Sequence, residues 1–397
     1  MIYSSRGFTL VEMIVVMAMF VIVIAAAGNT FSRIMRYSAQ ESGMAESNIE
    51  GVVGLEMMRK DISSAGFGLP WSVQTVIGYD EVNPAAGVRE AIAAAYNGTP
   101  DVEAQTEIPR AVWGGDDVTP GDPERLIEGS DYLVIRATSL GESATAQRWS
   151  FMNYTGQVRP SPLLPKSWTR DNLASTDWVS VIKVGLSGSF TKELVMNGAS
   201  FTTTYGNLGA FEPDESKVTH YVYGLSNAGQ PRMPFNRADY YVRVPAAGDE
   251  DKLPQRCAPN TGVLYKAVVD HSDGTVTATE TPVLDCVADM QVVYVLDALN
   301  NGVTTITGDI SALKAREIRE QLKIIQVYIL THEGGRDRLF TYPNKTVAVG
   351  PSVDGGITSG TGRTFDLETA IGTEWQQYRW KTYRVVVKPA NFGETIQ

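Results

Sequence analysis

The feature that most constrains this 397-residue chain is an apolar segment close to its amino terminus. Of the 20 residues from Phe8 to Ala27, only Thr9 and Glu12 are not apolar. A helix rises about 1.5 Å per residue, so this segment spans about 30 Å, the thickness of a bilayer's hydrocarbon core. We therefore predict a transmembrane helix over residues 8–28.

Three interpretations of this segment compete. It could be a secretory signal peptide, with Arg6 as its charged start and residues 25–27 as the cleavage site. It could also be a plain, uncleaved membrane anchor. Glu12 counts against both, because a carboxylate inside an apolar span costs about 2.5–3.5 kcal/mol and neither role offsets that cost. An ionisable side chain at this depth indicates a functional site that has a partner elsewhere.

The third interpretation supplies that partner. The residues Gly7-Phe8-Thr9-Leu10-Val11-Glu12 resemble the processing motif of type IV prepilins. The resemblance implies that a prepilin peptidase removes residues 1–7 as a leader, cutting between Gly7 and Phe8, and that Phe8 is then N-methylated. It also implies that Glu12 pairs with the Phe8 amine of a neighbouring subunit. Such pairing agrees with the cost of an isolated buried charge, which a second subunit in a fixed axial register would offset.

Beyond the membrane, the helix is predicted to continue as an amphipathic stalk over residues 29–65. No proline interrupts residues 8–69, and two glycines and a proline then end any helix. Apolar side chains recur every three or four residues along the stalk. They are Ala45, Ile49, Val52, Leu55, Met58 and Ile62. In a pilin-like protein this stripe would be divided between the protein's own head and the core of the fibre.

Residues 66–397 are expected to form a large exported head that is mostly antiparallel β-sheet, which makes the whole chain a pilin-like α+β protein. The predicted strands are Tyr132–Ala137, Val179–Val184, Val218–Tyr223, Tyr240–Val244, Val263–Val269, Val276–Thr279, Met290–Leu296, Ile324–Leu330 and Tyr383–Val387. Short helices are expected over Gly87–Tyr96 and Ala312–Leu322, and a tight hairpin turn at Asp273-Gly274. Stretches rich in glycine and proline could be loops on one sheet, or the seam between two subdomains near residues 210–260.

The chain has two cysteines, Cys257 and Cys286. Free buried thiols are one interpretation, but an oxidising exported compartment favours a disulfide between them. A bridge that closes a loop of this length would contribute about 3–4 kcal/mol.

Other functional chemistry is sparse in this sequence. A net charge of -11 argues against a nucleic-acid partner, since phosphate binding needs clustered lysine and arginine. The three histidines lie in separate segments without metal-ligand spacing. Asp297, Asn301 and Asp309 could hold a calcium ion, although a solvated loop is the simpler interpretation. We expect no other metal, no organic cofactor and no enzymatic activity.

Several head segments resemble the PilW-type minor pilins. They are residues 61–68, 130–136, 262–266, 286–294, 325–330 and 378–391. The resemblance implies a minor pilin that helps to prime or cap a type IV pilus. Its partners would be other pilins through the amino-terminal helix, prepilin peptidase and the assembly machinery of the inner membrane. The chain would cross that membrane once, export its carboxy-terminal head and later lie on the pilus at the cell surface.

Other functions remain open from the sequence. A pseudopilin of a type II secretion system would share the leader, the stalk and the sheet. A periplasmic enzyme with a membrane anchor is disfavoured by Glu12 and by the lack of a catalytic constellation. An adhesin at the fibre tip would use the parts of the head that match no known pattern, residues 71–129 and 140–215.

Overall fold

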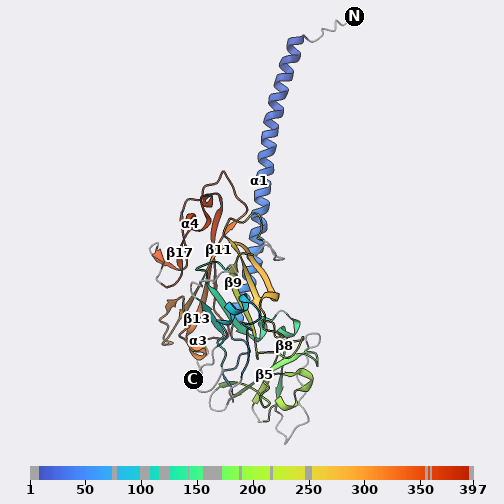
Figure 1. The fold of residues 1–397 in the computed structure, drawn as a ribbon, viewed down its shortest axis with the longest axis vertical. Coiled ribbons are helices and arrows are strands. Elements are labelled where there is room, and N and C mark those ends of the chain that lie inside the picture. The colour runs from blue at the N-terminus through green and yellow to red at the C-terminus, as the bar shows by residue number, and fades with distance from the viewer. Residues whose placement is uncertain are drawn as a thin grey trace.

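The computed structural model describes residues 9–73, 78–98, 108–115, 126–141, 143–154, 172–186, 190–214, 218–245, 253–353, 356–357 and 360–392. Figure 1 shows a long helix that projects from one end of an elongated head made mostly of strands. The predicted α+β arrangement, an apolar amino-terminal helix followed by an antiparallel β-rich head, is confirmed.

Helix α1 (Leu10–Ser64) is continuous over 55 residues and contains both the predicted membrane span and the predicted stalk. Thr9 is its N-cap residue. Just after the helix, Gly66 and Gly68 adopt positive φ angles of 79° and 70°, a conformation that glycine reaches without steric cost. These two glycines turn the chain out of the helix and into the head.

The larger sheet is antiparallel and forms the centre of the head. Its order is β18 (Arg379–Val387), β13 (Leu322–Glu333), β11 (Glu280–Leu296), β10 (Gly262–Val268), β9 (Asn236–Arg243), β3 (Tyr132–Ala137) and β2 (Val112–Gly115). The short strand β12 (Thr305–Thr307) pairs with the end of β11. The carboxy-terminal part of α1 packs on one face, where Met58 and Ile62 join the main hydrophobic core.

The other face of β11 and β13 is covered by a carboxy-terminal layer. Its elements are β14 (Thr346–Val349), β15 (Ser352–Val353), β16 (Gly356–Ile357), β17 (Arg363–Asp366) and α4 (Leu367–Ile371). Phe365, Leu367 and Trp375 from this layer pack against Val293 and Leu330 of the sheet. The larger sheet therefore lies between α1 and this layer (Figure 1).

A smaller sheet lies at the end of the head farthest from the amino terminus (Figure 1). Its order is β1 (Ser72–Val73), β6 (Phe190–Leu194), β5 (Trp178–Leu186), β8 (Val218–Ser226) and β4 (Trp149–Asn153), with β7 (Thr203–Thr204) beside β5. We call this part the distal lobe, and it has a small core of its own. Its strands β4 to β8 are inserted between β3 and β9 of the larger sheet. The chain returns to the larger sheet between Ser226 and Asn236. The division of the head into two subdomains with a seam near residues 210–260 stays a prediction.

The expected secondary structure holds in most places. The predicted helices contain α2 (Val88–Ala94) and α3 (Ala315–Gln321), and the predicted strands fall on strands of the two sheets with one exception. The prediction for Val276–Thr279 was wrong, because this segment forms a 3-10 turn over Thr277–Thr279. The Glu90 carboxylate accepts the backbone N–H groups of Val276 and Thr277, which removes donors that a strand ladder would use.

The expected hairpin turn at Asp273-Gly274 was also wrong in its type. These residues lie within the longer connection between β10 and β11 and do not join two strands directly. Gly274 has a φ of 77° and its N–H group donates to the Asp270 carbonyl. The chain therefore does turn at Gly274, but this turn lies within a loop and does not connect two paired strands.

Candidate assembly site on the amino-terminal helix

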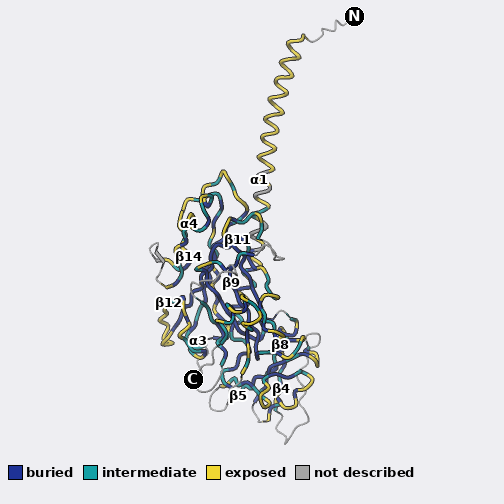
Figure 2. The backbone as a smooth tube through the Cα atoms, viewed as in Figure 1, coloured by how far each residue is buried: buried dark blue, intermediate teal, exposed yellow. Residues whose placement is uncertain are grey.

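The first half of α1 stands clear of the head. Residues Leu10–Met35 form a segment long and apolar enough to cross a membrane, and its most apolar part is not buried at all. Figure 2 shows the exposed helix extending away from the buried head. It is the one such segment among the described residues, judged by length and composition. Exposed apolar side chains of this size require lipid or another protein to cover them.

Glu12 lies in the first turn of this helix and forms a capping box with Thr9. The Thr9 N–H group and the Thr9 hydroxyl donate to Glu12 Oε2 at 2.9 and 3.0 Å, and the Glu12 N–H group donates to Thr9 Oγ1 at 3.3 Å. Thr9 is neutral, so these bonds orient the carboxylate but leave its charge uncompensated. Among the residues that the structure describes, no cation pairs with this carboxylate.

Gly7 and Phe8 lie outside the described residues. Cleavage between them, methylation of Phe8 and pairing of its amine with Glu12 stay predictions. The geometry around Thr9 does show a role for Glu12 that the sequence analysis missed. The spacing of a threonine three residues before a glutamate was the available signal for this capping box.

The stalk part of α1 divides its apolar side chains between two environments. Met58 and Ile62 are fully buried against the head, whereas Ile49 and Val52 are 66% and 67% exposed. Gly54 lies where the helix backbone meets β11, and a Cβ atom there would come within 1.9 Å of the Val283 carbonyl oxygen. The helix thus leaves the head between residues 52 and 58. The exposed apolar side chains of Ile49 and Val52 lie between the membrane span and the head.

The end of the stalk is fixed to the larger sheet by a buried ionic contact. Asp61 accepts hydrogen bonds from the Tyr240 hydroxyl and from Lys266 Nζ, both at 2.7 Å. Burial and the Asp61 carboxylate raise the pKa of Tyr240 above its usual value, which keeps the hydroxyl protonated as a donor. The Ala390 N–H group also donates to the Ser63 carbonyl at 3.0 Å. The helix and the head therefore behave as a joined unit.

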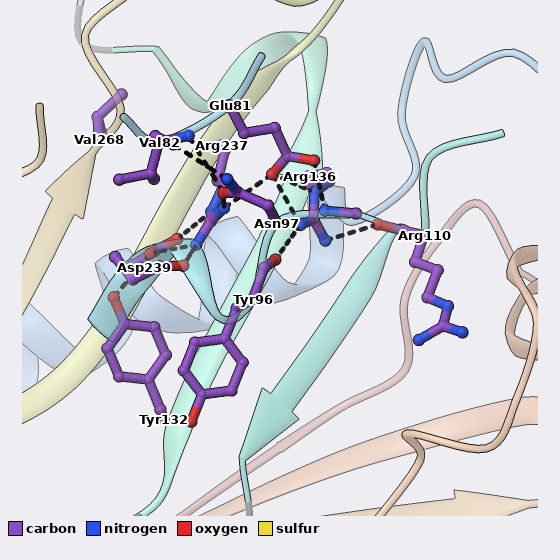
Figure 3. Close-up of polar contacts among 12 residues, drawn as sticks. Glu81, Val82, Tyr96, Asn97, Arg110, Tyr132, Arg136, Arg237, Asp239 and Val268 are labelled. Atoms are coloured by element: carbon purple, nitrogen blue, oxygen red, sulfur yellow. Dashed lines mark hydrogen bonds and ion pairs between the residues drawn. The ribbon is translucent and has the colours of Figure 1, made fainter. Parts of the chain in front are cut away.

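A second buried network holds residues 79–98 against the larger sheet (Figure 3). Glu81 Oε2 lies 2.7 Å from Arg136 Nη2 and 2.8 Å from Arg237 Nη1, and Arg237 also pairs with Asp239. Burial opposes the charge of Glu81, but the two arginines outweigh it and lower the pKa of that carboxyl. The sequence analysis did not predict this network. The available indication was the presence of charged residues, such as Arg136, within apolar strand segments. Its charges are satisfied within the protein, so it stabilises the fold.

The predicted disulfide is present. Cys257 and Cys286 are bonded, with their Cα atoms 4.8 Å apart, and the bridge ties the segment before β10 to β11. Beside it, His332 Nε2 accepts the Ala258 N–H group at 2.8 Å. Burial lowers the pKa of His332 to about 4, so the ring is neutral and can accept this bond.

In the loop proposed for calcium, the carboxylates accept hydrogen bonds from backbone N–H groups of the same loop. Asp297 accepts the N–H groups of Asn301 and Gly302 at 3.0 and 2.9 Å, and Asp309 accepts that of Ser311 at 2.7 Å. In the part of the chain that the structure describes, no group of three or more His, Cys, Asp or Glu residues is arranged to hold a metal ion. Calcium binding at this loop stays a prediction.

Comparisons with known proteins bear on the amino-terminal helix alone. The family model of the prokaryotic N-terminal methylation motif matches residues 3–28, which include Gly7, Phe8, Glu12 and most of the apolar span. Searches of curated proteins and of solved structures return no match. The specific resemblance to PilW-type pilins is therefore not confirmed. The chain carries, at its amino terminus, the signature of type IV prepilin-like proteins.

Proposed function

We propose that this protein is a minor pilin-like subunit of a type IV pilus that helps to prime or cap the fibre. In this proposal, prepilin peptidase cleaves after Gly7 and Phe8 is then methylated. One observation carries the proposal. The helix that follows the methylation motif runs without a break into the head, yet its residues 10–35 are all exposed with respect to the described part of the chain.

The proposal gives the helix two successive environments. Before assembly, it anchors the protein in the inner membrane as a single span, with the head on the oxidising, exported side where the disulfide forms. During assembly, it exchanges lipid for the helices of other pilins, and the assembly machinery of the inner membrane lifts it into the fibre. Glu12 supports this exchange, because its charge is costly in lipid and is compensated by an amine on a neighbouring subunit.

The size of the head supports a low-copy position near the fibre end. The larger sheet with its two covering layers, together with the distal lobe, makes a bulky body beside a single helix (Figure 1). Tight lateral packing along a shaft favours smaller heads, whereas an end position leaves room for a large one. In this role the protein is a structural component without enzymatic activity.

The charge of Glu12 provides the test. Glu12→Gln keeps the size of the side chain and an acceptor for the Thr9 N–H group, but it removes the negative charge. We expect this variant to insert and to be processed normally, while its amount in sheared fibres, measured by immunoblot, falls about tenfold or more. Thr9→Ala is the matched control, because it breaks the capping box and keeps the charge, and it should assemble close to the wild-type level.

Equal incorporation of the Glu12→Gln variant and the wild type would contradict the proposal. Formation of the disulfide in both variants shows that their heads have folded. A deletion strain separates the pilus from the alternative of a type II secretion pseudopilin. Loss of fibres with normal protein secretion supports the proposal, and the reverse phenotype overturns it.

A further inference from the structure

A cleft of about 530 Å³ opens where the end of α1 meets the distal lobe. Met57, Lys60 and Asp61 line it from the helix, and Phe67 from the turn that follows. Trp149 lines it from β4 of the lobe, and residues 139–141 line it from the connection between β3 and β4. Its volume lies within the range of about 300–1,000 Å³ that is usual for small-molecule sites, and clefts between two structural units are common places for such sites.

One wall of the cleft continues into a row of aromatic rings. On β4 and β8, Trp149 is paired with Tyr223 and Phe151 with Tyr221, so all four side chains point to the same face of the smaller sheet. Ring centroids lie 6.1 Å apart for Trp149 and Tyr221, and 6.4 Å apart for Tyr221 and Tyr223. Phe67, which lines the cleft, meets Tyr223 edge-on at 5.4 Å.

Trp149, Phe151 and Tyr221 do not belong to a hydrophobic core of the lobe. Tyr223 differs, because it packs against a second small cluster formed by Val73, Ile182 and Leu194. Met152 and Val222 alternate with the rings along the strands and fill the core of the lobe on the opposite face. The Trp149 residue is 38% exposed, and the other three rings of the row are partly buried. The row thus offers a partly exposed aromatic surface, with rings tilted against one another, that adjoins the cleft at Trp149.

The polar groups of the cleft can bind a partner rich in hydroxyl groups. The hydroxyl oxygen of Ser139 is buried and forms no hydrogen bond with any of the residues described. Gln147 is exposed, and its amide is held in place because Nε2 donates to the carbonyl oxygens of Ser139 and Gly141 at 2.7 and 3.2 Å. A ligand hydroxyl can both donate and accept, so it could satisfy Ser139 and use the oxygen of Gln147.

The charge of the cleft favours an anion. Asp61 and Lys266 neutralise each other at 2.7 Å, which leaves the exposed Lys60 as the excess charge among the lining residues that the structure describes. This local positive charge stands out on a chain with a net charge of -11. A single excess cation is too little for a nucleic-acid backbone, and the ionic and hydroxyl lining does not suit a lipid chain.

We propose that this cleft and the adjoining aromatic row bind an acidic saccharide, that is, a sugar chain whose rings carry carboxylates. The apolar face of a sugar ring stacks on Trp149, ring hydroxyls bond to Ser139 and Gln147, and a carboxylate lies near Lys60. The smaller sheet, which carries Trp149, lies at the end of the head that is farthest from the amino terminus (Figure 1). It is therefore accessible whether the protein is anchored in a membrane or placed at the end of a fibre.

The test uses the full-length protein in detergent micelles, titrated by calorimetry with hexagalacturonate as the acidic probe and with maltohexaose as its neutral counterpart. We expect saturable binding of hexagalacturonate and weaker binding of maltohexaose. Trp149→Ala should weaken the binding of both probes about tenfold or more. Lys60→Gln should weaken only hexagalacturonate, so that the preference for the acidic probe disappears.

Lys388→Gln is the matched control, because this exposed lysine follows β18 and does not line the cleft, and it should leave binding unchanged. Lys60 is exposed, so its variant should keep the wild-type thermal midpoint, and Trp149, which is 38% exposed, can lower the midpoint on truncation. A single cooperative thermal transition in each variant shows that the fold is intact. Absence of binding to either saccharide would overturn the proposal. Equal binding of hexaglutamate, an acidic peptide without rings, would assign the cleft to peptides and overturn it as well.

Discussion

Single residues in this head take their properties from burial and from distant partners. His332 is an example, because its ring lies among Tyr378 and Trp380 and accepts the Ala258 N–H group next to the disulfide. Burial lowers the pKa of His332 to about 4, compared with about 6.5 in an unfolded chain. The folded protein therefore holds the neutral ring and resists its protonation.

This difference predicts a pH dependence of stability. Above pH 6.5, both states hold a neutral His332, and its contribution to the free energy of unfolding is fully present. As the pH falls from about 6.5 to 4, His332 binds a proton in the unfolded chain but stays neutral in the folded protein. This difference lowers the free energy of unfolding by about 1.4 kcal/mol per pH unit. His332→Gln should reduce the slope by that amount in urea unfolding measured across this range.

Burial also lowers the pKa of His271 to about 4, so His271 contributes a slope of its own in the His332→Gln variant. Identical slopes in the wild type and the variant would show that His332 does not titrate in this way.

The sequence predicted some residue roles and could not predict others. Cysteine content and export were enough to predict the pairing of Cys257 with Cys286. The network around Glu81 could not be predicted, because its arginine partners lie 55 and 156 positions away along the chain. Only the fold brings such groups together, and a charged residue in an apolar strand does not indicate its partner.

At the scale of elements, α1 was the most predictable feature. A long apolar segment, a periodic stripe and the lack of proline predicted a helix that the structure shows from Leu10 to Ser64. Strands with clear alternation were also found, whereas Val276–Thr279 became a turn because Glu90, far away in the sequence, binds its backbone. Local pattern therefore predicted elements well where no distant side chain competed for the backbone.

The contact between α1 and β11 predicts different effects for two glycines of the same helix. Gly54→Ala would place a Cβ atom 1.9 Å from the Val283 carbonyl, so the helix must move away from the sheet. We expect a loss of about 1–3 kcal/mol in the free energy of unfolding, as for other overpacked sites. Gly43→Ala meets no atom within 4 Å and should be neutral or stabilise the helix by up to about 1 kcal/mol.

Urea unfolding of both glycine variants in the same detergent measures this contrast. If Gly54→Ala is as stable as Gly43→Ala, the helix does not press against β11 as described.

At the scale of the whole molecule, the chain combines a membrane-length helix with a β-rich head that contains a disulfide. The sequence predicted this combination, but it did not predict the strand order of the two sheets or the insertion of the distal lobe between β3 and β9. Strand order depends on pairings between distant segments, which local composition does not encode.

The disulfide allows a prediction at this scale. Cys257 and Cys286 are separated by 29 positions, and their bond restricts the unfolded chain over a loop of that length. Replacing both cysteines with alanine should lower the free energy of unfolding by about 3–4 kcal/mol. Urea unfolding of the oxidised wild type and the variant measures the change. A wild type purified from membranes with two free thiols would contradict an exported head.

The most direct test of the whole account is the amino-terminal sequence and the mass of the protein purified from membranes. The account predicts that the mature chain lacks residues 1–7, begins at Phe8 and carries a methyl group on its terminal amine. A chain that still begins at Met1, or one cut near Gly28 as a signal peptide would be, would contradict the account.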